Sequence, residues 1–154
     1  MNIIWQYLDK RSAAVNALKD YSSMAYIIAH TDEEIAQVHE DTTTLGSPAF
    51  TDMPGGSPNP QSGEMRIIAA IDEIDVLRER YRQAKEYMEW FQPAWDSLLE
   101  DERYVLEQFY GGEEEKQIDA VYNICEHLHI ERSTAYNKKN RAVQHLALLL
   151  YGKT

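Results

Sequence analysis

Apolar residues recur at intervals of three and four over residues 2–40, a segment without Pro or Gly. Since these intervals place side chains on one face of an α-helix, the pattern predicts a helix over residues 2–40. Thr31 followed by Glu34 is typical of a capping box and predicts that the helix breaks and restarts there. The predicted stripe comprises Ile4, Leu8, Arg11, Val15, Leu18, Ser22, Ala25 and Ile28.

A second stripe of the same kind predicts another long helix, from Glu64 to Gln92. Pro93 is expected to end or kink this helix, because proline lacks the backbone N–H that an inner helical residue donates. The stripe comprises Ile67, Ile71, Ile74, Arg78, Tyr81, Lys85, Met88, Phe91 and Trp95, and Leu77 and Ala84 widen it.

The segment between the two stripes, about residues 42–63, is rich in Gly, Pro and Ser and predicts a flexible loop. Two long amphipathic helices joined by one loop predict a two-helix hairpin at residues 1–95, or a coiled coil shared between subunits. The expected role of this region is oligomerisation. The fold class expected for the chain is all-α.

Residues 97–154 predict three shorter helices. A capping box formed by Ser97 and Glu100 would open the first, which stops at Gly111. The second is expected at residues 113–128. A tight turn around residues 129–132 follows, and Ser133 is expected to cap a final helix that runs to Tyr151. Two helices joined by a tight turn match a helix-turn-helix unit, which predicts a DNA-binding domain at residues 97–154.

The spacing of small and apolar residues adds detail to this prediction. Cys125 is small enough for a close helix crossing, and Ile130 is expected to fill the space beneath the turn. Ala135, Ala142 and Leu146 are expected to face inward, because their spacings of seven and four place them on one side of a helix. The polar residues between them are then left outward.

Charge is distributed unevenly along the chain. The formal net charge is -11, yet no Asp or Glu follows Glu131. Residues 117–154 carry 3 acids against 5 bases, whereas the rest of the chain is strongly acidic. A basic segment on an acidic chain is either a surface for an anion or an ordinary solvated helix face.

The segment "ICEHLHIERSTAYNKKNRAVQHL" resembles the promoter-reading helix-turn-helix in region four of bacterial sigma factors. The preceding "LLEDERYVLEQFYGG" resembles the first helix of that region. The chain is similar in particular to the small phage and prophage transcription regulators of the ArpU and RinA type. This resemblance covers about residues 97–151. The chain departs from it in having a longer first helix of the turn unit, beginning well before Ile124.

The resemblance implies that the final helix enters the major groove of double-stranded DNA with its N-terminal residues toward the bases. Thr134, Asn137 and Lys138, with Tyr136, are the expected base contacts. Arg132, Ser133, Lys139 and Arg141 are the expected phosphate contacts, which position the protein without reading sequence. The implied function is a sequence-specific transcription regulator that activates late genes with host RNA polymerase. A homodimer, formed through the helical region, is expected.

Other chemistries are not indicated by the sequence. No phosphate-binding loop or nucleophile elbow occurs, so an enzyme is not expected, and neither is a cofactor. Cys125, His127 and His129 are spaced by two, which does not place three metal ligands on one helical face. A single cysteine forms no internal disulfide, and no secretion signal or membrane span is expected, which favours the cytoplasm of a bacterial host cell.

Two other functions remain open at this point. Small phage proteins that combine a helix-turn-helix with oligomerising helices also include terminase-like DNA-packaging subunits. Alternatively, the basic helix binds an acidic protein partner, and the chain is a helical protein-interaction module.

Overall fold

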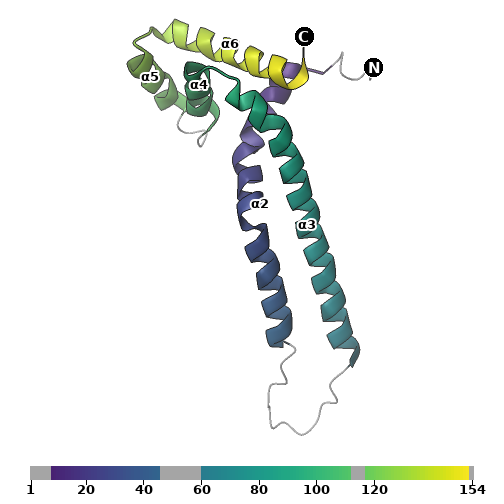
Figure 1. Cartoon of the computed structure of the whole chain (residues 1–154). Coiled ribbons are helices and arrows are strands. Elements are labelled where there is room, and N and C mark those ends of the chain that lie inside the picture. Colours follow the sequence, from purple (N-terminus) through teal and green to yellow (C-terminus); the bar gives the residue numbers. More distant parts are fainter. Residues whose placement is uncertain (1–7, 46–59, 112–116, 153–154) are drawn as a thin grey trace. The chain divides into compact units, whose positions relative to one another are not determined.

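The computed structural model describes residues 8–45, 60–111 and 117–152 of the chain. The regular structure of these residues is entirely helical, so the predicted all-α class is confirmed. The helices are α2 (Lys10–Leu45), α3 (Pro60–Asp96), α4 (Glu100–Tyr110), α5 (Gln117–Leu128) and α6 (Arg132–Tyr151) (Figure 1). None of these helices is long and apolar enough to cross a membrane.

Contacts divide the chain into two compact units. The hairpin unit is Met24–Glu86, and the bundle unit combines Met1–Ser23 with Tyr87–Thr154. α2 and α3 therefore each contribute to both units. This division differs from the predicted boundary near residues 95–97, because the start of α2 and the end of α3 pack with the shorter helices.

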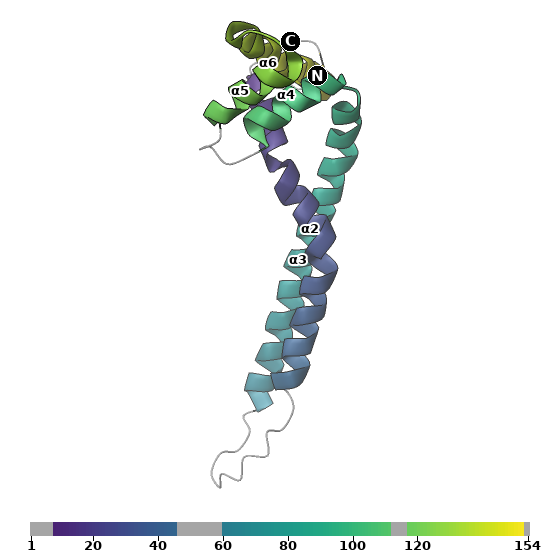
Figure 2. The same ribbon diagram turned by 90° about the vertical axis from the view of Figure 1, so that its left-hand side faces the viewer.

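In the hairpin unit, α2 and α3 run antiparallel and lie side by side (Figures 1 and 2). The less exposed residues of both helices recur at intervals of three and four, the spacing that keeps one stripe of a helix against a partner helix. The stripes are Met24, Ile28, Thr31, Ile35, Val38 and Thr42 in α2, and Ala70, Ile74, Leu77, Tyr81 and Ala84 in α3.

The stripe predicted for α3 is partly wrong within this unit. Ile71 is 52% exposed and Arg78 is also exposed, whereas Leu77 and Ala84 are buried. The N-terminal half of α3 carries apolar residues on two adjacent faces. The periodicity of apolar residues predicts that α3 has an apolar face. Which of its two apolar faces is buried depends on the position of the partner helix.

Thr31 does not break α2 as predicted. Its side chain is 3% exposed, and its hydroxyl donates to the backbone carbonyl of Ile27 within the same helix. Thr42 likewise donates its hydroxyl to the carbonyl of Val38, at 2.7 Å. Because these hydroxyls are satisfied one turn back along the helix, threonine is tolerated there and α2 continues to Leu45.

The N-terminus of α2 is set by Asp9, not by the apolar stripe. The carboxylate of Asp9 accepts the backbone N–H of Ser12 at 3.2 Å and its hydroxyl at 2.8 Å. Asp9 is therefore the residue that caps the helix, which begins at Lys10. The prediction of helix at Leu8 is wrong, and residues 1–7 lie outside the described residues.

Helices extend into both ends of the predicted loop of residues 42–63, because α2 ends at Leu45 and α3 begins at Pro60. Proline is favoured in the first turn of a helix, where its missing N–H would have no partner. Residues 46–59 of the predicted loop lie outside the described residues. Pro93 does not end α3, which continues to Asp96. The carbonyl of Pro93 accepts the hydroxyl of Ser97 at 2.7 Å.

The main core of the bundle unit joins α2, α3, α4 and α6. Arg11 and Ser22 of the predicted α2 stripe are exposed, whereas Ala14 is fully buried. Half of the residues in this core are alanines, and their small side chains allow the four helices to approach closely. The core residues are Ala14, Ala17, Phe91, Ala94, Leu98, Leu106, Ala142, Val143, Leu146 and Ala147.

Phe91 is the centre of an aromatic cluster within this core. Its ring is 0% exposed, and it stacks on Tyr87 with a centroid distance of 5.2 Å and on Trp95 at 6.0 Å. The hydroxyl of Tyr21 donates to Gln92 Oε1 at 2.9 Å, and that of Tyr87 donates to the carbonyl of Ala17. Burial raises the pKa of Tyr87. These contacts join the first part of α2 to the last part of α3.

Candidate nucleic-acid interface

α4, α5 and α6 share a second core, in which Val105 and Phe109 of α4 pack with Ile124 of α5 and Ala135 of α6. α4 begins differently from the prediction: its first residue is Glu100, and Leu99 occupies the capping position. The N–H of Leu99 donates to Glu102 Oε1 at 3.1 Å, so the predicted box of Ser97 and Glu100 is wrong. Glu102 thus supplies the side chain that accepts the backbone N–H of the capping residue.

A tight turn joins α5 to α6. α5 ends at Leu128, and His129 has a φ of 54°, in the left-handed region. The N–H of Ile130 donates to the carbonyl of Cys125 at 3.2 Å. This hydrogen bond and the positive φ at the preceding residue are features of a Schellman motif, which ends a helix sharply. Ile130 is partly buried against the second core, as expected of the residue that fills the space beneath the turn.

The start of α6 differs from the prediction by two residues. Glu131 has extended backbone angles and occupies the capping position, and its carbonyl accepts the N–H of Ala135 at 3.0 Å. Ser133 is therefore inside the first turn of α6, and the prediction that it caps the helix is wrong. No side chain caps this helix end, so its first backbone N–H groups are open to an outside acceptor.

The inward face of α6 agrees with the prediction. Ala135 and Ala142 are 0% exposed, and Leu146 is 1% exposed. Two alanines at the crossing allow α6 to lie close to α4 and α5. α6 packs against both α4 and α5 within the bundle unit (Figure 1). The rest of the α6 surface divides into three parts, and the structure distributes the predicted site residues among them.

The first part faces a cavity between α4, α5 and α6. Arg132, Tyr136 and Lys139 lie there, at spacings of four and three along α6. The Lys139 ammonium lies 5.1 Å from the ring centroid of Phe109 and 5.7 Å from that of Tyr136. These predicted DNA contacts are therefore partly engaged with the aromatic residues of the bundle.

The second part faces the acidic start of α4. Lys138 Nζ lies 4.0 Å from Asp101 Oδ2, and both residues are substantially exposed. His145 Nδ1 lies 2.9 Å from Glu102 Oε2, in a partly buried contact. An exposed ion pair at that distance contributes little to stability, but it lowers the net positive charge near Lys138.

The third part, which we call the polar face, is exposed to solvent. Two positions of the polar face, Asn137 and Arg141, lie one turn apart. Arg141 forms no ion pair with any residue in the described parts of the chain. α6 contains no carboxylate along its whole length. The polar face consists of Ser133, Thr134, Asn137, Asn140 and Arg141.

The polar face therefore keeps Ser133, Thr134, Asn137 and Arg141 of the predicted set and adds Asn140, which was expected to be outward. Helical periodicity accounts for part of this division. At about 100° per residue, Asn137 lies about 100° from Lys138 and about 160° from Lys139 around the helix. Arg141 lies only about 60° from Lys138, and both line a hollow beside Asp101 and Glu102 of α4. Sequence reasoning missed the cavity. Its apolar lining comes from α4 and α5, which no local pattern places beside α6.

The histidines near the turn do not form a metal site with Cys125. The ring of His127 stacks on that of Tyr104, with 4.3 Å between the centroids. Within the described residues, no group of three His, Cys, Asp or Glu side chains is placed to hold a metal ion. The role of the turn at His129 is to set the direction of α6 after α5.

Comparison of the chain with protein-family models, with curated proteins and with solved structures finds no match.

Proposed function

We propose that the chain is a sequence-specific DNA-binding transcription regulator of the phage type. The observation that carries this proposal is the combination of a sharp turn at His129 with the polar face that follows it. The turn sets α6 at a fixed angle to α5, and the buried alanines hold it there. An α-helix held in this way, with one side exposed, has the dimensions of the DNA major groove.

The side chains of the polar face suit base recognition. A carboxamide such as that of Asn137 can donate one hydrogen bond and accept another at the same time. This matches adenine, whose N7 accepts and whose N6 donates in the major groove. Thr134 lies one turn earlier on the same face and is our second base contact. Tyr136 and Lys138 lie on the flanks of α6, so as base contacts they would need to reach around the helix.

Phosphate contacts are expected at the edges of the polar face. Arg141 is exposed and has no ion pair with a described residue, and Ser133 lies in the first turn, where backbone N–H groups are uncapped. Anions bind readily at such helix starts. Arg132 and Lys139 extend the positive charge toward the cavity side. Since the chain as a whole carries -11, repulsion elsewhere would limit indiscriminate binding to DNA.

We further propose that the hairpin unit makes the regulator a homodimer. Ile68 and Ile71 of α3 are 58% and 52% exposed, and Val76 is 51% exposed. Ile68 and Ile71 lie one turn apart on one side of α3, and exposed apolar residues that neighbour each other in this way commonly mark protein–protein contacts. The charges favour a second copy: α2 has acids but no Lys or Arg from Met24 to Leu45, whereas Arg78 and Arg80 of α3 are exposed without an ion pair to a described residue.

Two palindromic half-sites, each read by one α6, would follow from such a dimer. Activation of late genes through host RNA polymerase is the regulatory outcome that the resemblance to sigma region four supports. It is tested by transcription from a bound promoter with purified host polymerase, with and without the protein.

The test of DNA binding is selection of bound fragments from the source genome with the purified full-length protein. Enrichment of a shared motif upstream of genes, lost in a Thr134→Ala/Asn137→Ala double variant, is the expected result. Lys19→Ala, which changes an exposed cation of α2, is the matched control and should keep the motif. Failure to bind any duplex at low salt, with an acidic protein partner retained, would instead support a protein-interaction module.

A further inference from the structure

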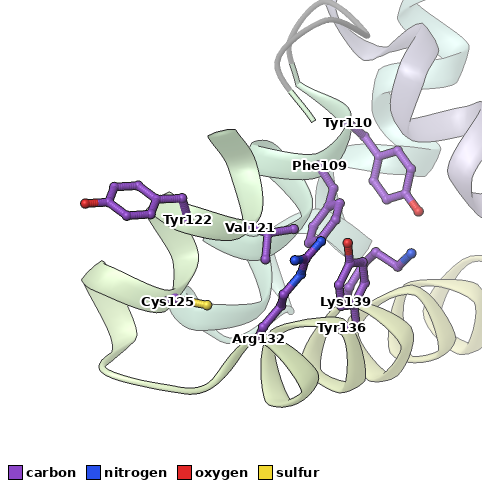
Figure 3. A pocket seen from close by; sticks show the side chains of 8 residues that line it. All are labelled: Phe109, Tyr110, Val121, Tyr122, Cys125, Arg132, Tyr136 and Lys139. Atoms are coloured by element: carbon purple, nitrogen blue, oxygen red, sulfur yellow. The ribbon is translucent and has the colours of Figure 1, made fainter. Parts of the chain in front are cut away.

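A cavity of about 640 Å³ lies in the bundle unit beside the polar face. α4, α5 and α6 all contribute side chains to it (Figure 3). Its volume lies within the range of small-molecule sites, about 300–1,000 Å³. The described lining residues are Phe109, Tyr110, Val121, Tyr122, Cys125, Arg132, Tyr136 and Lys139.

The inner wall of the cavity is apolar. Phe109 and Val121 are 9% and 7% exposed and belong to the second core. Figure 3 shows the Arg132 side chain extending from α6 toward these two residues, with Tyr136 and Lys139 beside them. The Phe109 and Tyr136 rings are inclined to each other with centroids 5.9 Å apart. A flat apolar group placed against this wall would contact aromatic and aliphatic carbon.

The polar groups of the cavity are hydrogen-bond donors. Arg132 and Lys139 carry positive charge, and no carboxylate occurs among the described lining residues. Neither cation forms an ion pair with any residue in the described segments, although the chain has 26 acids against 15 basic residues. Lys139 instead rests on two aromatic rings. Tyr110, whose pKa is raised by burial, adds a hydroxyl to the lining residues.

An apolar wall beside two cations that have no ion pair with a described residue favours a particular class of ligand. An uncharged apolar molecule would make no ion pair with the two cations. An inorganic anion would leave the apolar wall exposed to solvent. A molecule with both features satisfies both parts of the cavity, because charge-assisted hydrogen bonds then form beside buried apolar surface.

We propose that this cavity binds a small molecule with an aromatic or apolar body and one acidic group. The body packs on Phe109 and Val121, and a carboxylate, sulfonate or phosphate lies between Arg132 and Lys139. Because these cations are also expected phosphate contacts, an occupied cavity would weaken DNA binding. This last consequence rests on the proposed function, whereas ligand binding itself does not.

The first test uses anilinonaphthalene sulfonate, a fluorescent aromatic anion, with the full-length protein in the absence of DNA. Arg132→Gln and Lys139→Gln should each weaken its binding by about tenfold, the loss expected for a hydrogen bond to a charged group. Arg103→Gln removes an α4 cation that does not line the cavity and should leave binding unchanged. The uncharged analogue phenylnaphthylamine should bind all of these proteins alike.

Cys125 makes the test specific to the cavity, because it is the one cysteine of the chain and part of the lining. Saturating anilinonaphthalene sulfonate should slow the reaction of Cys125 with dithiodipyridine, a neutral thiol reagent. Unchanged reactivity at saturation would place the probe elsewhere and overturn the proposal. So would equal affinity for the sulfonate in the wild type and both charge variants.

Competition with DNA separates the two proposals. Probe binding that protects Cys125 and lowers the affinity for a selected operator supports both. Protection of Cys125 in a protein that binds no duplex keeps the ligand site and refutes the proposed function. Operator binding with no protection of Cys125 refutes the ligand site alone.

Discussion

The backbone N–H of Ile130 donates a hydrogen bond to the carbonyl of Cys125 at 3.2 Å, which closes α5 immediately before α6 begins. His129, the first residue after α5, has a φ of 54° in this turn. A side chain with a Cβ atom is strained in the left-handed region by roughly 1–2 kcal/mol, whereas glycine adopts it freely. The direction of α6 therefore depends on a locally strained residue.

His129→Gly should stabilise the protein, because it removes this strain at the position where Schellman motifs usually place glycine. We expect a net gain of about 0.5–1 kcal/mol in the free energy of unfolding, since glycine also loses more entropy on folding. His129→Val should destabilise, as a β-branched residue tolerates positive φ poorly. Urea unfolding of the three proteins measures both effects, and a destabilised glycine variant would contradict the assignment.

Asp9 should titrate below its ordinary range. The hydrogen bond from the Ser12 hydroxyl, followed by the one from the Ser12 N–H, lowers the pKa of the Asp9 carboxyl. A lowered folded-state pKa means that Asp9 stabilises α2 above the unfolded-state pKa and loses this effect as pH falls through the folded-state value. The side-chain carboxyl chemical shift, followed by NMR against pH, gives this pKa directly.

Ser12→Ala is the matched test of the cause. Removing the hydroxyl should raise the pKa of Asp9 toward its ordinary value, while the backbone N–H of residue 12 still donates. Ser22→Ala removes an exposed hydroxyl elsewhere on α2 and should leave the titration unchanged. A pKa of Asp9 that stays the same in Ser12→Ala would show that the hydroxyl is not the cause.

The helical class and the inward residues of α6 follow from the sequence, because both depend on local periodicity. Ala135, Ala142 and Leu146 lie where their spacing predicts. Helix ends were predicted less well. Ser133 and Ser97 are good capping residues by type, yet Glu131 and Leu99 occupy the capping positions.

The reason is that the packing of neighbouring helices fixes where each helix can begin. For α6 the turn at His129 places Glu131 in an extended conformation, so the helix starts before Ser133. For α4 the capping residue Leu99 has no hydroxyl, and Glu102 makes the second hydrogen bond of a capping box by accepting the N–H of Leu99. The cavity beside α6 could not be predicted at all, since Phe109 and Val121 meet Lys139 only through tertiary packing.

Phe91 should be among the most sensitive positions of the bundle unit. Its ring is fully buried between Tyr87, Trp95 and Tyr21. Phe91→Ala should lower the free energy of unfolding by about 3–5 kcal/mol through lost burial and the resulting cavity. Trp90→Ala, at a neighbouring aromatic residue that is 40% exposed, should cost clearly less. Equal losses in the two variants, measured by denaturant unfolding, would argue against this core.

The exposed apolar residues of α3 should control the oligomeric state. Ile68→Glu/Ile71→Glu places two carboxylates in the proposed dimer contact, and we expect the mass from light scattering to fall from two chains to one. Gln83→Glu adds a carboxylate at another exposed α3 position and should leave the dimer intact. A wild-type monomer would refute the dimer, and a ring of eight or more chains would favour a DNA-packaging subunit.

Asn137 and Arg141 should affect DNA binding in different ways although they lie one turn apart on the polar face. Asn137→Ala should reduce discrimination at one base pair of the operator by about 1–3 kcal/mol, because a base contact carries sequence information. Arg141→Ala should weaken binding to operator and random duplex alike. It should also reduce the slope of log affinity against log salt by about 0.9, as one phosphate contact is lost. Binding measured over a salt series on both duplexes separates these outcomes. An Asn137→Ala variant that loses affinity equally for operator and random duplex would show that this residue positions the helix without reading a base.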